Sequence, residues 1–126
     1  MSQHSKEIVL NFYEAYNQRD VERAMSYIGD TYIQHNPWVL DGPAGFRRFV
    51  EFLRDKFPDG RNEVKRVIAE DDLVALHVHS RRTPDEEGRA IVDIFRVEND
   101  KIVEHWDVIQ PIPREIYPPV TDNGYF

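Results

Sequence analysis

Apolar and polar positions in the first half of the chain alternate with the period of an α-helix. Apolar side chains recur at three- and four-residue spacing over Lys6–Arg19, over Val21–Ile28 and, most clearly, over Pro43–Phe57. Asp20 suits the N-cap of the second segment, and Gly29 suits its C-terminal stop. The pattern therefore predicts three helices.

The second half changes to the two-residue period of β-strands. Proline cannot continue a strand ladder, so Pro111 ends the last strand. Helices followed by strands predict an α+β fold, with one antiparallel sheet covered by helices on one face. The strands are expected over Glu63–Ala69, Val74–His79, Ala90–Val97 and Lys101–Gln110, the last two joined by a tight turn at Glu98-Asn99-Asp100.

Composition narrows the functional classes. The 126 residues suit one domain (1–126), with a core over 6–111 and an irregular tail over 112–126. The chain has no cysteine, which excludes a disulfide scaffold, a thiol nucleophile and a thiolate metal site. A net charge of −7 disfavours nucleic acid and anionic membranes as partners. Without an apolar run long enough for a signal peptide or a membrane span, we expect a cytoplasmic protein.

Particular residues then point to a family. The segment 32–37 (YIQHNP), followed by Asp41-Gly42 and the helix from Pro43, resembles the SnoaL-like polyketide cyclases. The long hairpin over Val92–Asp107 resembles the same proteins, which belong to the superfamily named after nuclear transport factor 2. The resemblance covers most of the chain, from about Ile8 to Gln110.

This resemblance implies a cone-shaped α+β fold. A curved antiparallel or mixed sheet would wrap around the N-terminal helices and enclose an internal pocket. Family cyclases close a ring by intramolecular aldol condensation and need no cofactor. The resemblance therefore implies cofactor-independent acid/base chemistry at a carbon α to a carbonyl, of the cyclase or isomerase kind. It also implies a small, apolar, carbonyl-containing substrate and a homodimer that forms through the outer face of the sheet.

Two aspartates are the first candidates for catalysis. Asp107 matches the aspartate that acts as acid and base in the family's cyclases. With a three-residue hairpin loop, Asp93 would face His105, Ile91 would face Asp107, and Phe95 would share that face. With a two-residue loop, the same face would instead join Asp93 to Trp106. Sequence alone leaves both registers open.

The chain departs from its relatives at two positions of this face. Asp93 stands where the best-known cyclases have a histidine, and Ile91 stands where they have a glutamine. Two carboxyl groups in one apolar pocket cannot both be ionised at low cost, so we expect one to hold a proton. We hypothesise that Asp107 is the base and that neutral Asp93, or His105, stabilises the enolate, as in the division of roles in ketosteroid isomerase.

Further candidates lie in the segment that the family places along the pocket wall and on the last strand. Asn36 is a predicted substrate contact, although an Asn-Pro pair also starts turns. His35 is either a proton donor or a histidine that ties the loop to the sheet. Trp106 is a possible substrate contact, and its alternative role is packing in the core or in a dimer interface.

Two other interpretations remain open. A metal site could use His77 and His79 with His35 and His105, but the alternation turns His77 and His79 away from the apolar face, so we expect no metal. The chain could also be a non-catalytic small-molecule binding protein or a dimeric interaction module. A shallow pocket or one filled by Trp106 would favour the module, and an arginine bonded to Asp93 would favour binding.

Overall fold

The computed structural model describes residues 2–112 and 118–126, so part of the predicted tail, 113–117, lies outside the described residues. In the described part of the chain, no helix is long and apolar enough to cross a membrane. The elements are α1 (Ser2–Asn17), α2 (Val21–Met25), β1 (Ile28–Gln34), α3 (Gly42–Lys56), β2 (Arg61–Glu70), β3 (Leu73–Arg81), β4 (Arg89–Glu98) and β5 (Lys101–Pro111).

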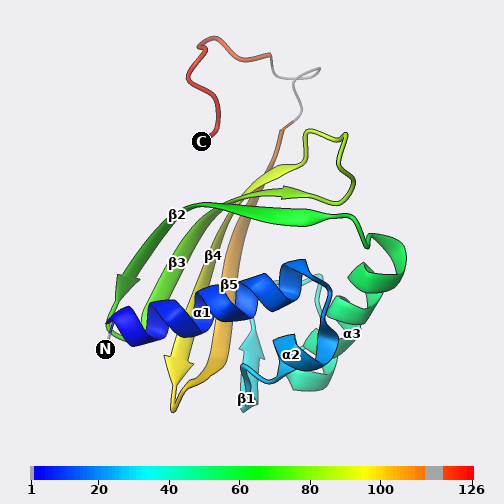
Figure 1. Cartoon of the computed structure of the whole chain (residues 1–126). Helices are drawn as coiled ribbons and strands as arrows, with labels where there is room; N and C mark the ends of the chain where they lie inside the picture. Colours follow the sequence, from blue (N-terminus) through cyan, green and yellow to red (C-terminus); the bar gives the residue numbers. More distant parts are fainter. Residues whose placement is uncertain (1, 113–117) are drawn as a thin grey trace.

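The five strands form one curved sheet in the order β1-β5-β4-β3-β2. Strands β2 to β5 pair antiparallel, and β1 pairs parallel with β5, which makes the sheet mixed. Figure 1 shows the long strands bending over α1, with α2 and α3 beside it. The predicted α+β class and the curved sheet around the N-terminal helices are confirmed.

Strand β1 is the element that the apolar pattern does not predict. It follows α2 after a short connection, so the second helix ends at Met25, and Gly29 lies in the strand instead of stopping a helix. The register of β1 against β5 breaks between Ile28 and Ile33. An edge strand with an irregular register and three exposed residues does not show a two-residue alternation.

The β4–β5 hairpin is closed by a two-residue turn, which is the second of the two loops that the sequence leaves open. Asn99 and Asp100 both have positive φ angles, of 50° and 65°. Glu98 pairs directly with Lys101 across this turn. Asparagine and aspartate tolerate this backbone region, and turns of this type match the twist of the two strands.

A bulge then changes the register before the hairpin reaches the predicted site. Val103 is an extra residue on β5, because the pairing shifts between the two residue pairs that flank it. Beyond the bulge, Asp93 pairs with Asp107, so both predicted registers are wrong here. The shift restores the face in which Asp93, Asp107 and His105 point the same way, while Trp106 points to the other side.

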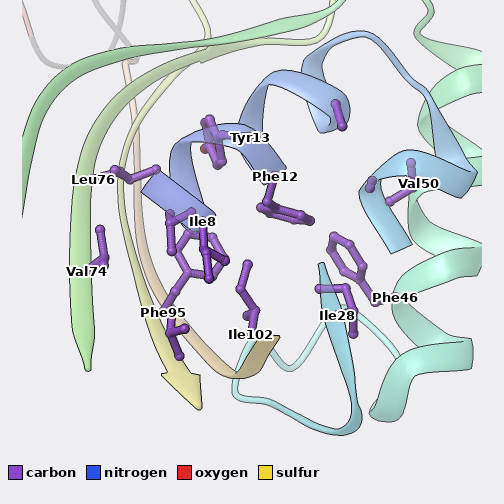
Figure 2. Packing of buried hydrophobic residues seen from close by; sticks show 14 of the residues in the cluster. Ile8, Phe12, Tyr13, Ile28, Phe46, Val50, Val74, Leu76, Phe95 and Ile102 are labelled. Atoms are coloured by element: carbon purple, nitrogen blue, oxygen red, sulfur yellow. The ribbon is translucent and has the colours of Figure 1, made fainter. Parts of the chain in front are cut away.

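The core lies between α1, α3 and the sheet face that they cover. Phe12 of α1 is 1% exposed, and its ring lies 5.7 Å from the ring centres of both Phe46 and Phe95. Figure 2 shows these rings together with Leu76 and Ile102, which are fully buried. Removing one such ring costs about 3–5 kcal/mol. This packing holds α1 over the strands that carry the candidate site.

The outer face of the sheet carries His77 and His79. Val74, Leu76 and Val78 of the same strand are fully buried, so the two histidines point outward, as the alternation predicts. Phe126 packs on this face, with its ring 4.6 Å from His79 and 5.3 Å from His77. The end of the tail therefore lies on the outer face. Homodimerisation through this face stays a prediction.

Candidate active site

A cavity of about 270 Å³ lies between the helices and the sheet face that they cover. Aromatic and aliphatic side chains from α1, α3 and β4 line it, among them Phe12, Phe46 and Ile91, together with polar and charged groups. Trp38, which follows β1, also lines the cavity and is 88% exposed. The cavity is thus formed by the same elements that build the core, and Trp106 does not fill it.

Asp93 is buried at one end of this cavity, the inner end, which it lines together with His105 and Asp107. It is 6% exposed, and both of its carboxylate oxygens have partners. The Tyr13 hydroxyl donates to Oδ2 over 2.6 Å, and His105 Nε2 lies 2.8 Å from Oδ1. Asn62 Nδ2 donates to the same hydroxyl over 2.9 Å, which directs the phenol proton toward Asp93. Burial and the charge of Asp93 raise the pKa of Tyr13, which therefore stays a donor.

The hydrogen bonds of Gln34 determine the protonation of His105. The backbone N–H of Asn36 donates to Gln34 Oε1 over 3.1 Å, so this atom is the amide oxygen. His105 Nδ1 lies 2.7 Å from that oxygen and must carry a proton to bond to it. The contact between His105 Nε2 and Asp93 Oδ1 then holds one further proton, shared by the pair. The pair is neutral overall whichever atom carries that proton.

Asp107 has fewer partners than Asp93. Its side chain is 11% exposed and lines the cavity. Asn36 Nδ2 donates to Oδ2 over 2.9 Å, and His105 Nε2 lies 4.0 Å from the same oxygen. Burial raises the pKa of Asp107, while the Asn36 hydrogen bond and the charge of His105 act in the opposite direction. Within the described residues, Oδ1 has no hydrogen-bond partner, so it remains free for a ligand.

Tyr32 of β1 adds a hydroxyl group to the same end of the cavity. Gln34 Nε2 donates to this hydroxyl over 3.1 Å, so the phenol oxygen acts as acceptor there. Burial, followed by the charge of Asp93, raises the pKa of Tyr32, and Asp107 adds to the effect. The hydroxyl therefore keeps its own proton, for which the described part of the chain supplies no acceptor.

The predicted site residues divide into two groups. Asp93, Asp107, His105, Asn36, Ile91 and Phe95 all line the cavity. His35 and Trp106 lie on the other side of the sheet, where their rings stack with centres 5.0 Å apart. His35 Nε2 is 2.7 Å from a Glu104 carboxylate oxygen, which corresponds to the alternative in which this histidine ties the loop to the sheet.

The histidines considered as metal ligands do not lie together in the structure. His77 contacts Arg66 over 2.9 Å and His79 contacts the Glu87 carbonyl over 2.7 Å, both on the outer face. Among the described residues, Asp93, His105 and Asp107 instead form the group whose ligand atoms lie within 4.8 Å of one another. The hydrogen bonds described above already join these three residues and Asn36 in a network that holds protons and needs no metal ion. Its donor set of two carboxylates and one imidazole could also hold a divalent cation.

Several cavity residues were not predicted from the sequence. Tyr13 belongs to an aromatic stripe on α1 that is typical of a core. Tyr32 and Gln34 precede the Asn-Pro pair on the unpredicted strand β1, so no alternation singles them out. Arg89 is the exception, because it lies two residues before Ile91 on the same strand face and one more step of the alternation would have included it.

Comparisons with known proteins agree with this architecture. A family model described as a SnoaL-like domain matches residues 9–105. No curated protein sequence matches the chain. A candidate ketosteroid isomerase from Kribbella flavida has a similar structure, with a TM-score of 0.75, 18% identity, and coverage of 95% of this chain and 91% of its own.

Two Streptomyces proteins have the same fold. AclR, a candidate hydroxylase from Streptomyces galilaeus, gives a TM-score of 0.73 at 24% identity, covering 87% of this chain and 91% of its own. IdmH, a candidate polyketide cyclase from Streptomyces antibioticus, gives a TM-score of 0.66 at 23% identity, covering 83% of this chain and 91% of its own. Different activities are thus assigned to proteins of one fold, and the side chains in the cavity must distinguish them.

Proposed function

Because the chain belongs to the SnoaL-like domain family, we propose that it is an enzyme that removes and returns a proton at a carbon α to a carbonyl group. The reaction is of the cyclase or isomerase kind and uses no cofactor. The observation that carries the proposal is the arrangement of Asp107, a buried carboxylate that faces the cavity with one oxygen free. Asp93, by contrast, is already hydrogen-bonded on both oxygens.

Asp107 acts as the general base in this proposal. Its Oδ1 takes the α proton, the C–H electron pair becomes the enolate double bond, and the carbonyl π electrons move to oxygen. The raised pKa of Asp107 makes its carboxylate a stronger base than an exposed aspartate. The proton then returns to another carbon in an isomerisation. In an aldol reaction, the enolate carbon instead attacks a second carbonyl carbon, whose π electrons move to its oxygen, and this oxygen takes the proton from Asp107.

The enolate oxygen needs donors that do not have to rearrange during the reaction. The Tyr32 hydroxyl is suited to this role, because its proton has no acceptor among the described residues. The proton shared by His105 and Asp93 lies next to the same site, in a pair that is neutral overall. This proton corresponds to the hypothesis that neutral Asp93 or His105 stabilises the enolate, with the two residues now acting as a pair.

The alternative is a binding protein that does not catalyse a reaction. The sequence-based criterion for it was an arginine bonded to Asp93, and the partners of Asp93 are instead Tyr13 and His105. A binding protein needs hydrogen bonds to orient its ligand, but it has no need for a buried carboxylate with a free oxygen, whose burial has a cost. The network therefore supports catalysis.

The proposal is tested with 2-tetralone, a bicyclic ketone with acidic α C–H bonds. Its exchange of hydrogen for deuterium in D₂O is followed by NMR with and without the protein. We expect the protein to accelerate exchange, and Asp107→Asn to lower the accelerated rate by about 10²–10⁴-fold. Asp55→Asn, an exposed aspartate on α3, is the matched control and should exchange at the full rate.

Three outcomes decide the assignment. Binding of the ketone without any acceleration of exchange would support the binding protein instead. Full activity in Asp107→Asn would show that another group is the base. Loss of exchange after treatment with EDTA, restored by a divalent cation, would show that Asp93, His105 and Asp107 hold a metal ion.

A further inference from the structure

The end of the cavity away from Asp107 is lined by arginines. Arg19, Arg82 and Arg89 all line it, together with the hydroxyl-bearing ring of Tyr16. The Arg19 guanidinium lies 5.6 Å from the centre of the Tyr16 ring. Burial raises the pKa of Tyr16, while each of these three guanidinium groups acts in the opposite direction. A cluster of three positive groups is unexpected inside a chain whose net charge is −7.

These arginines differ in how their hydrogen-bond donors are used. Arg19 donates to the Phe57 carbonyl through Nε and Nη2 and to the Tyr16 carbonyl through Nη1, so it joins two chain segments. Arg89 donates through Nη2 to Ser80 Oγ over 3.2 Å. Its Nε is buried and has no hydrogen-bond partner within the described residues. A buried cationic donor without an acceptor is costly, so the site lacks an oxygen at this point.

The Arg82 side chain packs against aromatic rings, and its positive charge has no ion-pair partner within the described residues. Its guanidinium lies 5.2 Å from the ring centre of Phe57 and 5.9 Å from that of Phe52. Glu86 is the acidic residue nearby, and one of its carboxylate oxygens accepts the backbone N–H of Arg82. Within the described residues, none of the cavity arginines 19, 82 and 89 forms an ion pair with a carboxylate. Burial and then the charge of Arg82 lower the pKa of Arg89, while the charges of Glu86 and Tyr16 act in the opposite direction.

Strand β4 determines the distance between the two ends of the cavity. Arg89, Ile91 and Asp93 lie on the same face of this strand. Four strand residues span about 13 Å, and Ile91 with its partner Ile109 provides an apolar surface between the ends. A ligand that fills the cavity therefore meets arginine donors at one end, apolar side chains in the middle and the acid/base network at the other end.

We propose that the substrate is an anion, with a carboxylate bound by Arg89 and Arg82 and its reacting carbonyl placed at Asp107. This inference rests on the proposed function, and it names the substrate class. A carboxylate matches the planar fork of a guanidinium and would give Arg89 Nε the oxygen that it lacks. The substrate is thus a keto acid with an apolar body, which adds a carboxylate to the small, apolar carbonyl compound that the resemblance implies.

A pair of ligands that differ only in charge tests the proposal. Naphthalene-2-acetate and naphthalene-2-acetamide have the same ring system and nearly the same size. Their affinities for the full chain are measured by isothermal titration calorimetry at constant ionic strength. We expect the carboxylate to bind at least ten-fold more tightly than the amide, and Arg89→Gln to remove this preference. Arg54→Gln, an exposed arginine on α3 that loses the same charge, should retain it.

The controls separate this proposal from the one on which it rests. Circular dichroism melting shows whether Arg89→Gln is folded, and Arg89→Lys keeps the charge while removing the fork. Equal affinity of the two ligands for the wild type, or an unchanged preference in a folded Arg89→Gln, would overturn the anion site. Asp107→Asn should keep the carboxylate preference, so a failure of the exchange experiment leaves this result unaffected.

Discussion

The two ends of the cavity both contain buried polar groups, but they differ in whether these groups have hydrogen-bond partners within the protein. At the inner end, buried polar groups satisfy one another, since Tyr13, Asp93, His105 and Gln34 form a continuous chain of hydrogen bonds. At the other end, a buried arginine donor has no acceptor among the described residues. Burying polar groups has a cost in both places. At the inner end, protein groups supply the hydrogen-bond partners of Asp93, whereas at the arginine end the missing acceptor has to come from a ligand.

The comparison separates chemistry from recognition. Asp93 and His105, whose hydrogen bonds are complete, are held rigidly and can stabilise charge beside the free oxygen of Asp107 without reorganising during the reaction. Groups with unused donors are suited to selecting a ligand, because they gain most when the missing partner arrives. Changes at the inner end should therefore alter rates, and changes at the arginine end should alter affinity.

Among the three changes that compare the two ends, Asp93→Asn at the inner end is expected to have the largest effect. An asparagine can still accept from Tyr13, but it removes the proton shared with His105. We expect exchange of 2-tetralone to fall by about 10²–10³-fold, since one preorganised charge-stabilising group is lost. The ratio of naphthalene-2-acetate to naphthalene-2-acetamide affinity should stay within two-fold of the wild type. A variant that changes this ratio and keeps its exchange rate would reverse the roles of the two ends.

A smaller effect is expected from Arg82→Gln at the arginine end. The guanidinium of Arg82 packs on two rings and carries no ion pair among the described residues, so its loss removes attraction without leaving a charge unpaired. We expect naphthalene-2-acetate to bind about ten-fold more weakly, a change of about 1.4 kcal/mol. Exchange of the uncharged 2-tetralone should remain at the wild-type rate. A matching loss of affinity for the amide would mean that Arg82 supports the cavity shape and not the anion.

The smallest effect is expected from Asn36→Ala, and it appears in the pH dependence. The Asn36 hydrogen bond lowers the pKa of Asp107, so its removal raises that pKa further. Exchange requires ionised Asp107, so its rate rises with pH through this pKa. The acidic limb of the pH–rate profile should therefore move to higher pH, with several-fold slower exchange at mildly acidic pH and convergence at alkaline pH.

The control for this shift is Asn11→Ala on the exposed side of α1, which should leave the profile in place. A slower rate at every pH would indicate that Asn36 positions the substrate and does not tune the base. A shift of the limb to lower pH would contradict the hydrogen bond that the structure places between Asn36 and Asp107.

The sequence supports much of the fold because most elements bury one regular face. The apolar stripes of α1 and α3 and the alternation of β3 identify those elements directly. Strand β1 is not predicted from the apolar pattern, because it lies at an edge of the sheet, has an irregular register and exposes polar side chains. The shared face of Asp93, His105 and Asp107 was foreseen, but the pairing of Asp93 with Asp107 was not, because the bulge at Val103 has no sequence signal of its own.

The hydrogen-bond partners in the cavity were harder to foresee. Tyr13 looks like any other aromatic residue on the buried stripe of α1, and only its contact with Asp93, 80 positions away, gives it a polar role. Arg19, Arg82 and Arg89 come from separate elements, and nothing in their spacing shows that they meet. Contacts between distant segments follow from the curvature of the sheet, which local patterns do not encode.

The bulge at Val103 also constrains how related chains can vary in length. If Val103 paired with Arg96 without a bulge, the rest of β5 would shift by one position, so that Trp106 would point into the cavity and Asp107 would point to the opposite side. Deleting Val103 would instead remove the bulge and keep Asp93 paired with Asp107. Related chains that keep this chemistry should therefore have either the bulge with its extra residue or neither of the two.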